Sequence, residues 1–216
     1  MNWSFPLVRV LGTQIRIHFT FFLLLLWVGL ASHAEHGWAG AAFGVAFILA
    51  LFLCVILHEF GHVLTARAFG ISTPDITLLP IGGVARLERM PRRPIHELLV
   101  ALAGPAVNVV IAAILFTLLR AGSPLQEVRL EPQSITGFLA NLMAINVWLA
   151  VFNLVPAFPM DGGRVLRALL AMRFPYALAT KLAATVGQVM AILGVYLGFV
   201  LPAPILILVA LFIFVM

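Results

Sequence analysis

The sequence contains a single cysteine and few charged residues. Cys54 alone excludes an intrachain disulfide and any zinc cluster built from cysteines, and we interpret it as a small buried thiol. Only 10% of the 216 residues are charged, whereas 63% are hydrophobic. A soluble protein of this length would lack the polar surface needed to cover such a chain. The composition therefore indicates a membrane protein with several spans.

Acidic residues are the scarcer of the charged classes, with 8 against 13 basic residues and a net charge of +5. In a membrane protein the positions of basic residues indicate orientation, because they accumulate on the cytoplasmic side. With a cytoplasmic N-terminus, every basic residue except Arg120 and Arg129 falls on that side. We expect a multi-pass protein of the cell membrane with its N-terminus in the cytoplasm, and we infer no nucleic-acid binding.

About six apolar stretches are long enough to cross or enter a bilayer as helices. The predicted spans are residues 17–31, 39–69, 97–119, 135–155, 182–201 and 204–216. The last is short and has no polar tail, so we expect a longer natural protein to continue beyond it. The predicted fold class is an all-α multi-span membrane protein.

Two segments lack helical periodicity. Residues 1–18 partly alternate apolar and polar side chains, as an interfacial strand or hairpin does. Residues 71–89 combine β-branched residues, prolines and the pair Gly82–Gly83, which predicts extended strands around a turn. Irregular backbone at membrane depth is tolerated only inside protein or along a watery cavity. We therefore expect a small strand element beside the active site.

The predicted second span contains the motif His58-Glu59-Phe60-Gly61-His62. Two histidines at positions i and i+4 share one helical face, so both imidazoles can reach one metal ion. Glu59 is next to the first ligand and can serve as the base that takes a proton from metal-activated water. The motif predicts a zinc hydrolase site within a membrane segment.

A catalytic zinc takes three protein ligands, and this helix supplies only two. The carboxylates left as candidates are Asp75, Glu88, Glu97 and Asp161. Asp161 is the best placed, because prolines and glycines between residues 156 and 163 must break a helix while the chain is still apolar. An unwound backbone there lets the carboxylate turn inward, where a cation would stabilise it.

Three motifs in this order resemble the site-2 proteases, intramembrane zinc metalloproteases that cut transmembrane segments of regulatory proteins. They are residues 58–62 (HEFGH), 104–108 (GPAVN) and 153–162 (NLVPAFPMDG), accompanied by Gly82–Gly83. The resemblance implies that His58, His62 and Asp161 bind one Zn²⁺ and that Glu59 is the catalytic base. It also implies that Asn153 steadies the substrate or the oxyanion. The candidate substrate-binding residues are Gly82, Gly83, Val84 and Asn108.

The resemblance also bears on domains and partners. Many site-2 proteases carry a PDZ module between the second and fourth spans, and no linker here is long enough for one. The compact form resembles the subgroup that often ends in cystathionine-synthase-type nucleotide-sensing domains, which these residues do not contain. We expect a single transmembrane metalloprotease domain over residues 1–216. Its expected partners are a transmembrane-helix protein substrate and the lipid bilayer, and the sequence does not indicate a subunit number.

Two other classes of protein would place histidines and a carboxylate inside membrane spans. A zinc transporter or channel would do so, but it would not need a glutamate next to the first ligand. An inactive scaffold that binds membrane helices usually lacks a ligand or the base, and both are present here. Proteolysis that depends on the metal would distinguish the three classes.

Overall fold

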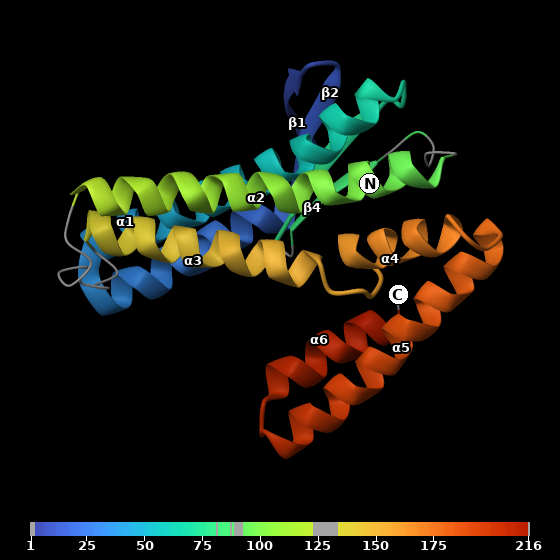
Figure 1. Ribbon diagram of the computed structural model, residues 1–216. Coiled ribbons are helices and arrows are strands. Elements are labelled where there is room, and N and C mark those ends of the chain that lie inside the picture. The colour runs from blue at the N-terminus through green and yellow to red at the C-terminus, as the bar shows by residue number, and fades with distance from the viewer. Residues whose placement is uncertain (1–2, 81, 87, 89–92, 123–133, 216) are drawn as a thin grey trace.

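The computed structural model describes residues 3–80, 82–86, 88, 93–122 and 134–215, which form six helices and one four-stranded sheet (Figure 1). The strands are β1 (Ser4–Val10), β2 (Thr13–His18), β3 (Asp75–Leu79) and β4 (Gly82–Arg86). The helices are α1 (Phe19–Ala68), α2 (Pro94–Gly122), α3 (Ile135–Asn153), α4 (Asp161–Ala171), α5 (Tyr176–Val200) and α6 (Pro204–Val215). The predicted fold class is confirmed.

Helix α1 is two antiparallel arms joined at Gly37, which alone within it has non-helical dihedral angles, with φ 67° and ψ −163°. The arms pack closely: a Cβ added at Gly44 would lie 2.5 Å from the Ser32 hydroxyl, and one at Gly29 would lie 3.4 Å from Val45. The first arm continues through the polar residues near 35, which were expected to form a link. The two arms, α2, α3, α5 and the shorter α6 account for the predicted apolar segments.

In the part of the chain that the structure describes, four helices are long and apolar enough to cross a membrane, namely α1, α2, α3 and α5. Helix α2 packs against α1 and α3, and α4 packs against α2. Helices α5 and α6 form a hairpin that extends from α4 and diverges from α3 (Figure 1). Helix α5 begins at Tyr176, six residues before the predicted start at 182. The prediction from apolar length missed its first turns, because they include Lys181 and are not uniformly apolar.

The two predicted strand segments form one sheet, in the order β1-β2-β3-β4. The pairs β1–β2 and β3–β4 are antiparallel, whereas β2 and β3 are parallel, with Ile15 opposite Ile76. This parallel pairing across the first two spans was not predicted. Strand β4 is an edge strand, since it pairs only with β3.

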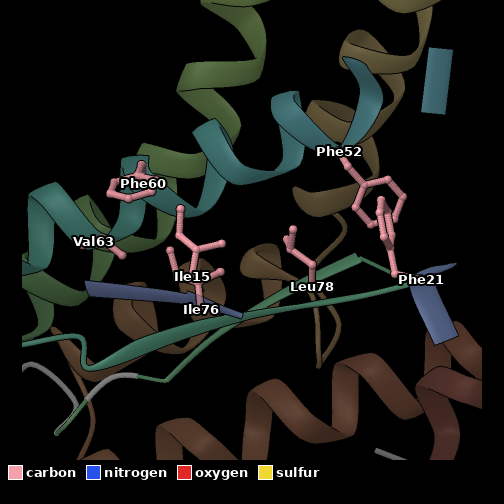
Figure 2. Close-up of a cluster of buried hydrophobic side chains, with 7 residues drawn as sticks. All are labelled: Ile15, Phe21, Phe52, Phe60, Val63, Ile76 and Leu78. Carbon is pink, nitrogen blue, oxygen red and sulfur yellow. The ribbon is translucent and has the colours of Figure 1, made fainter. Parts of the chain in front are cut away.

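The sheet packs against the second arm of α1 through a buried apolar cluster (Figure 2). The cluster contains Ile15, Phe21, Phe52, Phe60, Val63, Ile76 and Leu78. The rings of Phe21 and Phe52, on opposite arms of α1, meet edge to face with centroids 4.6 Å apart. Because Phe60 lies within the histidine motif and Val63 directly follows it, this cluster fixes the sheet beside the predicted active site.

Candidate metal centre

Side chains from α1 and α4 meet at one buried point. His58 and His62 lie one turn apart on the second arm of α1, and their Nε2 atoms are 3.1 Å from each other. The Oδ2 atom of Asp161 lies 3.2 Å from His58 Nε2 and 3.0 Å from His62 Nε2. All three side chains are buried. The structure therefore brings together the predicted ligands, although they are about 100 residues apart in the chain.

The hydrogen bonds at the other ring nitrogens determine which nitrogen of each histidine faces the cluster. His62 Nδ1 is 2.7 Å from the Val100 carbonyl oxygen, and His58 Nδ1 is 3.2 Å from Asn108 Oδ1. Both oxygens are acceptors, so each Nδ1 carries the proton and donates it. In the neutral form of each ring, Nε2 then presents a lone pair to the cluster, which is the arrangement that orients histidine ligands in metal sites.

Helix α2 contacts both imidazole rings through Gly104. A Cβ added at this position would lie 2.7 Å from His58 Cε1 and would also collide with His62 Nε2. Only a glycine fits in this gap, so the Gly-Pro motif has a steric function that the sequence did not specify. Helix α2 supplies both the surface behind the rings and the two acceptors that orient them.

Asp161 occupies the N-terminal end of α4, directly after the unwound residues 154–160. The backbone at this break is tightly packed, because a Cβ added at Gly163 would lie 2.8 Å from the Ala157 carbonyl carbon. Asp161 directs Oδ2 toward the histidines, whereas Oδ1 lies 3.8 Å from Arg164 Nη1. The predicted helix break thus places the carboxylate at the centre.

Glu59 is half-buried and lies under strand β4. A Cβ added at Gly83 would be 2.8 Å from Glu59 Cγ and 3.1 Å from its Oε1. The predicted strand element therefore lies directly beside the predicted base. In the same strand, Gly82 pairs with Leu79 and Val84 pairs with Thr77.

The two asparagines singled out in the sequence lie in different places. Asn108 is fully buried in α2 behind His58. Asn153 is half-buried at the last position of α3, where the unwound segment begins. Of the other carboxylates weighed as a third ligand, Asp75 begins β3, Glu88 is exposed, and Glu97 is buried and paired with Arg167.

The donor set fits zinc. Two neutral imidazole nitrogens and one carboxylate oxygen, with ligand atoms within 4.8 Å of one another, match a three-ligand catalytic zinc site that keeps a fourth position open. Among the histidine, cysteine and acidic side chains of the described residues, His58, His62 and Asp161 form the group whose geometry suits a metal ion. Sequence reasoning missed the Val100 carbonyl, because a backbone oxygen carries no residue signature.

Comparison with known proteins gives a consistent result. A sequence model described as peptidase family M50 matches residues 46–129 and 125–197. A zinc metalloprotease of Methanocaldococcus jannaschii is 38% identical over 216 residues, which cover 99% of this chain and 59% of that protein. The stage IV sporulation protein FB of Bacillus subtilis is 31% identical over 136 residues, 62% of this chain and 44% of that protein.

The fold is similar to a solved structure titled site-2 protease from Methanocaldococcus jannaschii. The TM-score is 0.69 at 36% sequence identity, and the match covers 98% of this chain and 92% of the other. The matched region spans 59% of the length of the curated Methanocaldococcus jannaschii protein and 44% of that of the Bacillus subtilis protein.

Proposed function

The chain belongs to peptidase family M50, and from this premise we propose that it is an intramembrane zinc metalloprotease. Its substrates would be membrane-bound regulatory proteins, cut within or near a transmembrane segment. The observation that carries the proposal is the convergence of two histidine Nε2 atoms and the Asp161 carboxylate, with Glu59 adjacent, between helices that are apolar enough to span a membrane.

The proposed roles follow from the geometry around each residue. His58, His62 and Asp161 would hold one zinc ion. Bound zinc supplies Lewis acidity, which activates water at neutral pH and polarises a carbonyl group. Glu59 accepts a proton from the attacking water and passes it to the leaving amine, as expected of a carboxylate next to the metal that is not used as a ligand.

The two asparagines are proposed to have different roles. Asn108 orients His58, since Asn108 Oδ1 accepts a hydrogen bond from His58 Nδ1. The Asn108 side chain is fully buried. This geometry favours an orienting role over direct substrate contact. Asn153, half-buried at the start of the unwound segment, is proposed to steady the substrate or the tetrahedral oxyanion with its amide group.

Strand β4 is the proposed binding site for the unwound substrate. A helical peptide bond is shielded by its own hydrogen bonds, so the segment must become extended before water can attack. An edge strand can replace the lost hydrogen bonds by pairing with the substrate. Gly83 of this strand lies against Glu59, so a substrate paired there would be close to the proposed base.

The defining experiment uses purified protein and a transmembrane-helix substrate. We expect cleavage that 1,10-phenanthroline abolishes and that its non-chelating isomer leaves intact. Glu59→Gln should keep about one zinc per chain yet lose at least about 100-fold in rate, because it removes the base and no ligand. Asp161→Ala should lower the zinc content itself. Full zinc occupancy in Asp161→Ala would reject that ligand and return attention to Asp75 or Glu88.

The same material tests the alternatives. A zinc transporter would move zinc across vesicles without cleaving the helix, and an inactive scaffold would bind the helix and leave it whole. We propose the protease because Glu59 has no function in either alternative.

A further inference from the structure

A second buried charged pair lies apart from the metal ligands. Glu97, in the first turn of α2, is fully buried, and Arg167 of α4 is 8% exposed. Arg167 Nε donates to Glu97 Oε1 at 2.8 Å, and Arg167 Nη2 donates to the same oxygen. The other carboxylate oxygen, Oε2, is buried and has no hydrogen-bond partner among the described residues.

Stability alone does not explain this pair. Removing two charges from water is costly, and a buried pair often contributes no more than apolar side chains of the same volume would. Here the carboxylate is satisfied at one oxygen only, so the cost is higher than for a fully bonded pair. The pair therefore calls for a function in the arrangement of the helices.

The Arg167 guanidinium joins helix α4, which carries it, to three other segments of the chain. It binds Glu97 of α2, and its central carbon lies 5.3 Å from the ring centroid of Phe158 and 5.2 Å from that of Tyr176. Phe158 belongs to the unwound segment that ends at Asp161, and Tyr176 is the first residue of α5. Such cation–aromatic contacts add orientation as well as attraction.

The same helix, α2, orients both histidine ligands. The Val100 carbonyl oxygen, one turn after Glu97, accepts a hydrogen bond from His62 Nδ1, and Asn108 Oδ1 accepts one from His58 Nδ1. Asp161, on the other hand, is carried by α4, the helix that Arg167 fixes to α2. The position of Asp161 Oδ2 relative to the two Nε2 atoms therefore depends on how α4 lies on α2.

We propose that Glu97 and Arg167 form a positioning pair that fixes α4 on α2 and so sets the place of Asp161 in the metal centre. The inference rests on the proposed zinc site, whose ligands it concerns. Neither residue touches the ligand atoms, so both act through the helices that carry those atoms. Loss of a group that bonds a metal ligand directly typically lowers metal affinity by about 10- to 100-fold. We expect a loss at the lower end of that range for this pair, which acts through the helices.

The test measures zinc affinity in detergent by competition with a soluble chelator, together with the absorption spectrum of the cobalt-substituted protein. Arg167→Met should weaken zinc binding by about 10-fold or more and alter the cobalt spectrum. Arg167→Lys, which keeps the charge but not the two-nitrogen contact, should have a smaller effect of the same kind. Arg173→Met, at an exposed arginine just beyond α4, is the matched control and should change neither value.

The double variant Glu97→Gln/Arg167→Met separates positioning from simple charge compensation. It leaves no unpaired buried charge, so its thermal stability should recover relative to Arg167→Met, while zinc affinity stays low. Zinc affinity and cobalt spectrum within twofold of wild type in folded Arg167→Met and Arg167→Lys would overturn the proposal. Recovery of zinc affinity in step with stability in the double variant would also overturn it. Wild-type protein that binds no zinc would instead contradict the proposed function.

Discussion

At the scale of single residues, the metal centre depends on features that a motif of ligand residues does not record, namely an absent side chain and a main-chain oxygen. Gly104 leaves room for two imidazole rings, and a backbone carbonyl at Val100 selects the tautomer of His62. Glu59 has a similar relation to Gly83, which lies directly against it. The side chains of the motif are thus held in place in part by glycines, which lack a side chain, and by one main-chain oxygen atom, that of Val100.

Gly104→Ala is predicted to reduce zinc affinity by at least about 10-fold, as the loss of ligand orientation typically does. The added methyl carbon would lie 2.7 Å from His58 Cε1, so the rings or the helix must shift. Ala106→Val adds bulk at an exposed position of the same helix and should leave zinc affinity unchanged. Zinc titration of both variants, with helicity measured by circular dichroism, tests this prediction. Unchanged zinc affinity in Gly104→Ala would show that the rings can move without cost.

At the scale of elements, the structure combines rigid helices with two irregular segments at the same site. The unwound residues 154–160 let Asp161 turn inward, and the edge strand β4 lies over Glu59. Both segments contact helices, since Ala157 lies against Gly163 of α4 and Gly187 of α5, and Gly83 lies against Glu59 of α1. Such contacts agree with the rule that non-helical backbone at membrane depth packs within protein or lines a cavity. Helices α1 and α2 supply the histidines and the groups that orient them, whereas the irregular segments bring in Asp161 and the strand beside Glu59.

Proline substitution along β4 tests substrate pairing at this edge. Proline removes one backbone donor, so positions facing away from β3 should lose proteolysis while zinc content and melting temperature stay near wild type. Positions whose donor bonds β3 should instead destabilise the sheet. We expect Val84→Pro to impair cleavage with zinc retained.

Leu7→Pro is the control, because Leu7 lies at the irregularity in β1, at the opposite edge of the sheet. Intact proteolysis with proline at every position from Gly83 to Arg86 would rule out strand addition here.

At the scale of the whole molecule, the α5–α6 hairpin extends from α4 and diverges from α3 (Figure 1). It carries none of the proposed site residues. A transmembrane substrate must pass between helices to reach the buried proposed ligands, and movement of an element without site residues displaces no proposed ligand directly. We therefore infer that the hairpin and the first arm of α1, residues 19–36, bound the entrance.

A crosslink between the first arm of α1 and α6 is predicted to block cleavage of a transmembrane substrate. Cysteine pairs would be scanned between these segments in a Cys54→Ser background, with and without a crosslinker. A small water-soluble chelator should still remove zinc from the locked protein at the unlocked rate, because hydrolysis requires access for water and the lock is designed to exclude only a helix. If every crosslinked protein cleaves the substrate at the normal rate, the entrance does not lie between these segments.

Orientation in the membrane is predicted from the basic residues, nearly all of which lie on the side expected to be cytoplasmic. In the same Cys54→Ser background, Arg173→Cys should react with an impermeant maleimide only from the cytoplasmic side. Glu35→Cys, near the turn between the arms of α1, should react only from the opposite side. Both positions are exposed. Labelling in the reverse sense would invert the proposed topology.

The sequence by itself determined the membrane class, the positions of most spans, the histidine motif and the helix break at Asp161. These features are local: helix periodicity, apolar length and proline placement depend on neighbouring residues in the chain. Tertiary structure alone decided that the N-terminal hairpin pairs in parallel with β3, that Val100 orients His62 across 38 positions, and that Glu97 meets Arg167 across 70. These contacts arise from how apolar helices pack, and many arrangements of such helices share one hydrophobic pattern. The proposed ligands could therefore be named from the sequence, as could Asn108, although not its contact with His58. The Val100 carbonyl and the Glu97–Arg167 pair could not.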